Sequence, residues 1–174
     1  MSKRPDPSEY AEYYESYIRR VPEGNIVAVL REQGEAACRF LAGLPADKAE
    51  FRYAPEKWTL KEVLGHVIDM EWVFTYRALS FARGAEAALP SVDQDEFMAA
   101  SDFQAFSLAE LVEALRHLRR ANTLMFEHFG DEVLERRGEA AGYRFTVRAL
   151  LYVIAGHERH HMNIIRQRYL GQTT

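Results

Sequence analysis

The stretch 59–70, TLKEVLGHVIDM, carries both the start signal of a helix and the apolar stripe by which that helix packs. Thr59 and Glu62 have the spacing of a capping box, in which the two side chains satisfy free backbone amides at a helix start. Apolar residues then recur at helical spacing: Leu60, Val63, Val67, Met70 and Val73. The pattern predicts a helix from Thr59 to about Ala82 whose buried face includes His66.

Three further segments show the same organisation. Residues 25–44 begin with a candidate N-cap, Asn25. Residues 107–129 begin with a second capping box, formed by Ser107 and Glu110. The last segment follows Thr146 and ends before Gly171. Four helices of about twenty residues, each with one apolar stripe, pack most economically as an antiparallel four-helix bundle. The expected fold is therefore all-α.

The remaining segments are expected to cover this bundle. The long second connection, residues 84–106, is expected to cross it and to contain a short helix near Asp95–Ala100. Residues 143–145 have a weak strand signal and are expected to lie in a loop. Four tyrosines near the N-terminus share one helical face, which predicts a short helical segment packed on the bundle: Tyr10, Tyr13, Tyr14 and Tyr17.

Composition narrows the class of protein. The 174 residues suit a single domain, 1–174, and a formal charge of −4 argues against binding to nucleic acid or to a membrane surface. Cys38 is the only cysteine, so an internal disulfide is impossible, and we interpret it as a core residue. The longest apolar run, Ala149–Ala155, is too short to span a bilayer, and no charged leader precedes an apolar stretch. We expect a cytoplasmic protein.

The histidines carry most of the functional prediction. His157 and His161 lie four residues apart on the apolar stripe of the last helix, so their rings point the same way. With His66 they make three inward-facing imidazoles, the number of protein ligands common in catalytic divalent-metal sites with one open position. We interpret His160 as a rim or packing residue. We expect His117 and His128 to be solvated and Cys38 to be a core residue, so none of these three belongs to the site.

Two carboxylates near these histidines allow alternative interpretations. Asp69, one turn after His66, is either a hydrogen-bond partner of that ring or a solvated residue. Residues 157–161 also match H-E-x-x-H, the motif of zinc proteases in which the glutamate is the general base. Those enzymes take a third ligand downstream, and residues 162–174 contain neither histidine nor acid. We therefore interpret Glu158 as a surface charge.

The chain resembles the DinB-like family of bacterial four-helix proteins, which includes the bacillithiol S-transferases. The resemblance extends over nearly the whole chain, and its most specific stretches are WTLKEVLGHVID at 58–69 and AGHERHH at 155–161. The family's metal ligands are one histidine of the second helix and an H-x-x-x-H pair of the last, positions that match His66, His157 and His161 here. The bacillithiol transferases carry a further histidine where this chain has Ile164.

The resemblance implies a divalent cofactor (nickel, zinc, iron or manganese), a small-molecule substrate and, in some members, a homodimer. The first functional hypothesis is a metal-dependent transferase that activates a small thiol for attack on an electrophile. Because a coordinated thiol is deprotonated outright, such an enzyme needs no cysteine of its own. The alternatives are a metal-dependent hydrolase of a small ester, amide or lactone, and a non-enzymatic metal-binding or stress-response protein.

Overall fold

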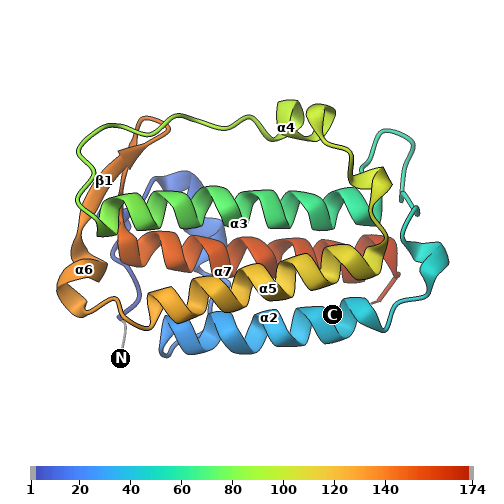
Figure 1. Ribbon diagram of the computed structural model, residues 1–174, viewed down its shortest axis with the longest axis horizontal. Helices are drawn as coiled ribbons and strands as arrows, with labels where there is room; N and C mark the ends of the chain where they lie inside the picture. Colours follow the sequence, from blue (N-terminus) through green and yellow to red (C-terminus); the bar gives the residue numbers. More distant parts are fainter. Residues whose placement is uncertain (1–2, 173–174) are drawn as a thin grey trace.

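Local start signals place the four long helices of the computed structural model, which describes residues 3–172. They are α2 (Ile26–Ala42), α3 (Leu60–Ala82), α5 (Leu108–Phe126) and α7 (Val147–Ile164) (Figure 1). The side chain of Asn25 caps α2, and both predicted capping boxes form, at Thr59 with Glu62 and at Ser107 with Glu110. The all-α four-helix bundle is confirmed, with boundaries close to those expected.

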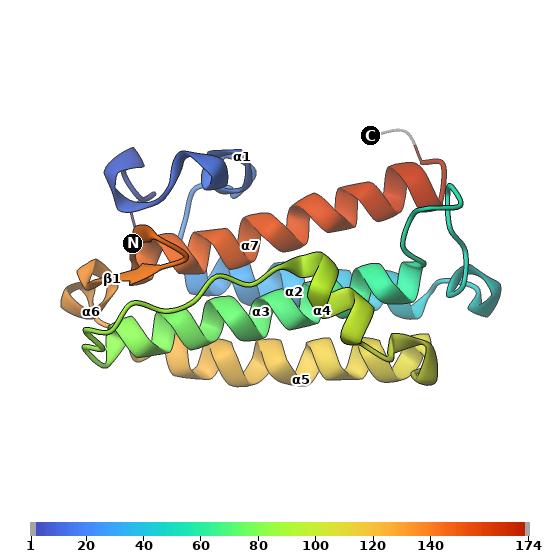
Figure 2. The same ribbon diagram turned by 90° about the horizontal axis from the view of Figure 1, so that it is seen from above.

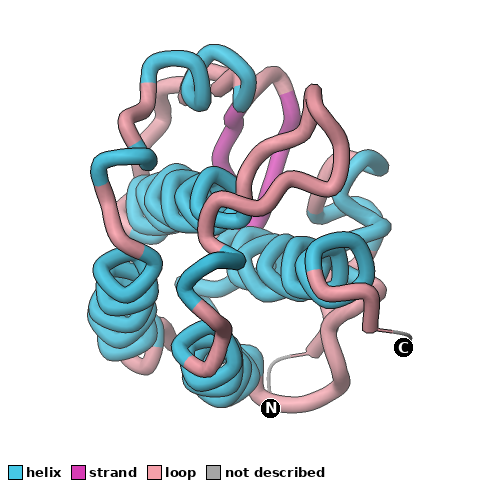
Figure 3. The backbone as a smooth tube through the Cα atoms, turned by 90° about the vertical axis from the view of Figure 1, so that its right-hand side faces the viewer, coloured by secondary structure: helices cyan, strands magenta, loops and turns pink. Residues whose placement is uncertain are grey.

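The long connection decides how the bundle is threaded. Residues 84–106 run back along the length of the bundle, so α5 starts at the same end as α3 and the two helices run in the same direction (Figures 1 and 2). An end-on view shows the four helices around a common core (Figure 3). The most extensive helix contacts join α3 to α7 and α2 to α5. The first of these interfaces brings His66 opposite the C-terminal half of α7.

Polar contacts hold the connection against α3. It contains α4 (Gln94–Ala100), the expected short helix, and the 3-10 turn η4 (Phe103–Ala105). The buried Lys61 of α3 donates to the carbonyl oxygens of Gln104 and Phe106, at 3.1 and 3.0 Å. The side chain of Phe103 occupies the space beside Gly65 that a larger residue would fill. These contacts hold residues 103–106 of the connection against the turns of α3 next to His66.

Residues 143–145 do not form a loop, and the sequence-based expectation was wrong there. They belong to β2 (Tyr143–Thr146), which pairs with β1 (Arg137–Ala140) in an antiparallel hairpin. The two turn residues, Ala141 and Gly142, have φ values of 53° and 79°, the backbone that a tight hairpin turn requires. Alanine is an unusual residue at such a position, which explains the weak signal. The third long helix also ends earlier than expected, and a short helix, α6 (Asp131–Glu135), follows.

The N-terminal segment is less regular than a single helix. Two 3-10 turns, η1 (Pro7–Glu9) and η2 (Glu12–Tyr14), precede the one-turn helix α1 (Glu15–Ile18), which packs on α7. Because of these breaks the four tyrosines have different surroundings, from buried Tyr10 to Tyr13, which is 71% exposed. The segment lies along α7 from its cap, Thr146, to His160.

The last long helix lies at the centre of the molecule. Every residue from Ala149 to Ala155 is buried, and a π-helical turn, η5 (Ile165–Tyr169), extends α7. A helix that is apolar on all sides is a buried one. Cys38 lies in the core as expected. Among residues 3–172, no helix combines the length and apolarity that crossing a membrane requires.

Candidate metal centre

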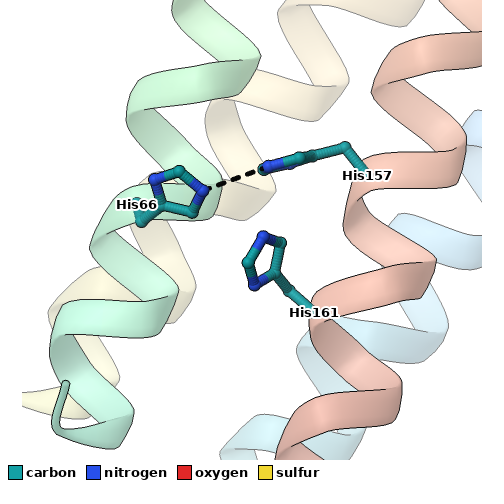
Figure 4. Close-up of side chains that lie close together, drawn as sticks. All are labelled: His66, His157 and His161. Atoms are coloured by element: carbon teal, nitrogen blue, oxygen red, sulfur yellow. Dashed lines mark hydrogen bonds between the residues drawn. The ribbon is translucent and has the colours of Figure 1, made fainter. Parts of the chain in front are cut away.

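The three predicted ligands meet at the interface of α3 and α7 (Figure 4). His66 projects from α3, and His157 and His161 project from successive turns of α7. One ring nitrogen of each lies within 4.8 Å of the others, and Nε2 of His66 is 3.1 Å from Nε2 of His157. His66 and His157 are buried, and His161 is partly accessible. The arrangement matches the trio expected from the sequence.

The surroundings keep these imidazoles neutral. Burial lowers the pKa of His66 to about 4 and, with the nearby His66 and His160 rings, that of His161 to about 3. The pKa of His157 falls well below its usual value of 6.5 because of burial and the other imidazoles. A neutral imidazole offers one nitrogen lone pair, which is the form that binds a metal ion. The residues present therefore fit a divalent cation.

Aromatic rings enclose the cluster. Trp58, the residue before the cap of α3, lies 5.1 Å from the ring of His66. On the other side, Phe74 and Tyr17 approach His157 edge to face, at 5.7 and 5.6 Å between ring centroids. Such walls exclude water from two of the three ligands and strengthen electrostatic interactions within the site.

A cavity of about 280 Å³ opens beside His161. Its walls are largely aromatic and aliphatic, with charged and amide side chains among them: Tyr53, Trp58, Val63, Ile164 and Tyr169, and Glu56, Lys57, Gln94 and Asp95. The hydroxyl of Tyr169 donates to the carbonyl of Trp58 at 2.5 Å, which joins the end of α7 to the start of α3. The cavity lies near the lower end of the usual size of ligand pockets. A small molecule held there would contact one of the three ligands.

The other histidines lie where the sequence predicted. His117 and His128 are exposed, and Nε2 of His117 lies 3.6 Å from Oε2 of Glu113. His160 is half-buried at the rim, with its ring 5.3 Å from that of Tyr17.

Asp69 is half-buried, and burial raises its pKa. Within the part of the chain that the structure describes, no hydrogen bond joins Asp69 to His66, so neither interpretation of this residue is confirmed.

Glu158 is not a surface charge, and that expectation was wrong. Its side chain is buried against Arg119 of α5, with Oε2 2.6 Å from Nη2. Burial raises the pKa of Glu158, and the neighbouring Arg119 opposes that shift. The expectation assumed one buried face on α7, whereas α7 is covered by α3, α2 and α1. Since Glu158 does not join the ligand cluster, it does not occupy the position of a zinc-protease base.

The sequence carries a signal that Glu71 and Arg119 form a buried pair, though none that Glu158 joins them. Glu71 interrupts the apolar stripe of α3 between Val67 and Phe74, and Arg119 interrupts that of α5 between Leu115 and Phe126. Opposite charges at stripe positions of two helices indicate a buried ion pair, since buried charges are normally paired.

Comparisons with known proteins agree with this fold. The family model of the DinB superfamily matches residues 30–165. YfiT from Bacillus subtilis, described as a probable metal-dependent hydrolase with an unusual four-helix bundle topology, has a TM-score of 0.74 at 17% identity, over 99% of this chain and 95% of that one. A DinB-like protein, YjoA from Bacillus subtilis, has a TM-score of 0.60 at 18% identity, over 87% and 95% of the two chains. No curated protein sequence matches the chain.

Proposed function

The chain belongs to the DinB superfamily, and on that premise we propose that it is a divalent-metal enzyme that transfers the sulfur of a small thiol to an electrophile. One observation carries the proposal. Three neutral histidines form the cluster, no fourth ligand residue joins them among residues 3–172, and a small cavity adjoins His161. A structural zinc site normally closes its fourth position with protein, whereas a catalytic one leaves it open.

The residues around the cluster favour a thiol over water as the nucleophile. A divalent ion held by His66, His157 and His161 would lower the pKa of a thiol or water molecule bound at its open position. A thiol ionises near pH 8.5 even without help, so it needs no protein base. The described cluster includes no carboxylate, and Glu158 faces Arg119. In the transfer, the thiol proton leaves to solvent, sulfur forms a bond to carbon, and the leaving group departs with its electron pair.

The residues that line the cavity favour a small, partly apolar electrophile as the second substrate. Trp58, Tyr53 and Tyr169 present aromatic surface, and Ile164 takes the position at which bacillithiol transferases carry a further histidine. An apolar side chain at this wall favours an apolar group of the substrate. The cytoplasmic location and a homodimer stay predictions.

A second candidate is a metal-dependent hydrolase. It is supported by the description of YfiT, which shares the fold at 17% identity. The same three histidines would serve, with water in place of the thiol. A non-enzymatic metal-binding role is the third alternative, and the accessible cavity beside His161 counts against it.

One assay separates these functions. Protein loaded with zinc or nickel is mixed with a panel of low-molecular-weight thiols and a chloronitrobenzene electrophile, and separately with a nitrophenyl ester without thiol. We expect thiol-dependent thioether formation that His66→Ala abolishes and that His160→Ala, a change at the rim of the site, retains. Ester hydrolysis without thiol would instead favour the hydrolase. Stable metal binding without turnover of either substrate would favour the non-enzymatic role.

A further inference from the structure

A buried ionic network lies one residue away from a proposed metal ligand. At its centre is Arg119 of α5, whose Nε and Nη2 donate to the two carboxylate oxygens of Glu71 on α3, at 2.8 and 2.7 Å. Its Nη1 donates to the carbonyl oxygen of Leu30 on α2, at 2.9 Å, and Nη2 also lies 2.6 Å from Glu158 on α7. The guanidinium of this α5 residue therefore contacts the other three long helices.

The charged side chains of the network are buried. Glu71 and Glu158 are each 2% exposed and Arg119 is 4% exposed. Asn122 donates to Glu71 and to Thr75, at 3.1 and 2.9 Å, and completes the polar contacts. Two carboxylates share one guanidinium, and burying such charges costs free energy that apolar residues of the same size would not. A network of this kind is therefore weak evidence for a gain in stability.

A glycine of α2, Gly34, leaves space for the side chain of Arg119. A Cβ at Gly34 would lie 2.8 Å from Cγ of Arg119 and 3.0 Å from Nη1, closer than side chains normally approach. Glycine inside a helix lowers helix stability by about 1 kcal/mol relative to alanine. The glycine at position 34 therefore lowers the stability of α2 but leaves the space that the side chain of Arg119 occupies.

We infer that Arg119 and Glu158 are positioning residues that fix the rotation of α7 relative to α3 and so direct His157 and His161 toward His66. The inference rests on the proposed metal site. Apolar contacts alone allow small rotations and shifts of a helix. The contacts of Arg119 with both carboxylate oxygens of Glu71 give its guanidinium a defined direction, and the single ion-pair contact with Oε2 of Glu158 ties α7 to it. Glu158 directly follows His157, about 100° further round α7. Its contact with Arg119 therefore sets the direction of the neighbouring ring.

Two substitutions of Glu158 distinguish positioning from general-base chemistry. Glu158→Gln keeps an oxygen that Arg119 can contact, and Glu158→Leu removes it; both remove a base. The probe is Co²⁺, whose visible absorption reports ligand geometry and whose titration gives the dissociation constant. We expect Glu158→Gln to change Co²⁺ affinity less than about threefold. Glu158→Leu should weaken it about tenfold or more, the range for residues that orient metal ligands, and alter the spectrum.

Further variants keep the test independent of folding. Leu115→Ala, a buried apolar truncation on α5 that removes no hydrogen bond or ion pair of the network, is the control for lost stability and should retain the wild-type Co²⁺ spectrum. Gly34→Ala should stay helical by circular dichroism but, because its methyl group displaces Arg119, weaken Co²⁺ binding as Glu158→Leu does. If Glu158→Leu does not fold, Gly34→Ala tests the positioning role in its place.

The outcomes separate this inference from the function on which it rests. Wild-type affinity and spectrum in both Glu158→Leu and Gly34→Ala would overturn the positioning role while leaving the metal site intact. A loss of activity of about 10²-fold or more in Glu158→Gln with full metal occupancy would also overturn it and make Glu158 a base. A wild-type protein that binds no Co²⁺ would overturn both the inference and the proposed function.

Discussion

At the scale of single residues, the three clustered histidines make the sharpest prediction. Each supplies one nitrogen to the cluster, so His66→Ala, His157→Ala and His161→Ala should each remove most of the bound metal. His117→Ala and His128→Ala change exposed residues and should leave the metal content unchanged. Elemental analysis of the purified variants measures this directly. Full occupancy in His66→Ala would mean that α3 contributes no ligand.

A second residue-scale prediction concerns Gly156, directly before His157. A methyl group at this position would overlap the backbone of Tyr17, because α1 lies against α7 there. Gly156→Ala should therefore displace α1 and destabilise the protein by about 1–3 kcal/mol, as overpacking typically does. Urea unfolding measures the change. Gly43→Ala is the matched control, since its Cβ would meet only ordinary contacts at 3.5 Å, and an equal loss in both variants would refute the steric explanation.

At the scale of elements, one carboxylate docks the N-terminal segment on α7. Glu9 of η1 accepts hydrogen bonds from Thr146 at 2.7 Å and from Arg148 at 2.8 Å. Burial alone would raise the pKa of Glu9, but hydrogen bonds from Arg148, the Asp6 amide and Thr146 outweigh it and hold the pKa below its usual 4.5. A lowered folded-state pKa stabilises the protein above the unfolded-state pKa, and this contribution is lost as pH falls through the folded-state value.

The docking contact predicts a specific pH dependence. Wild-type protein should lose stability as pH falls below about 4.5, and Glu9→Gln should be less stable at neutral pH but lose less on acidification. Urea unfolding between pH 3 and 7 compares the two slopes. Glu12→Gln, at an exposed position of η2, should follow the wild-type curve. Parallel curves for wild type and Glu9→Gln would show that Glu9 does not contribute.

At the scale of the whole molecule, the metal is expected to join two helices that are distant in sequence without being required for folding. His66 and His157 are 91 residues apart, and the bundle has an extensive apolar core of its own. Free metal at a hundred times its dissociation constant stabilises the native state by roughly 2.7 kcal/mol. For a chain of this size that corresponds to roughly 5–10 °C in melting temperature.

Circular dichroism of chelator-treated protein checks this expectation. The apo protein should keep its helical spectrum and melt at the lower temperature, and added metal should restore the difference. A largely unfolded apo protein would indicate a structural metal and weaken the proposal of an enzyme. An unchanged melting temperature on addition of metal would contradict the site itself.

The sequence by itself determined the four long helices and the cluster of three histidines. Capping at Thr59 and Ser107 joins residues three apart, and the pair His157 and His161 is one turn apart, so both features can be read without knowing the rest of the fold. His66 was found because it continues an apolar stripe. Periodicity shows that such a face is buried, though not what it is buried against.

Only the tertiary structure decided what those faces meet. Glu158 looked solvated because its partner, Arg119, lies on another helix, and the network with Glu71 forms only when α3, α5 and α7 are packed together. The parallel course of α3 and α5 likewise follows from the path of residues 84–106 (Figure 2). Local signals depend on neighbours along the chain, whereas the partners of a buried charge are brought to it by folding. That difference is why the cluster of three histidines could be predicted and the residues proposed to orient them could not.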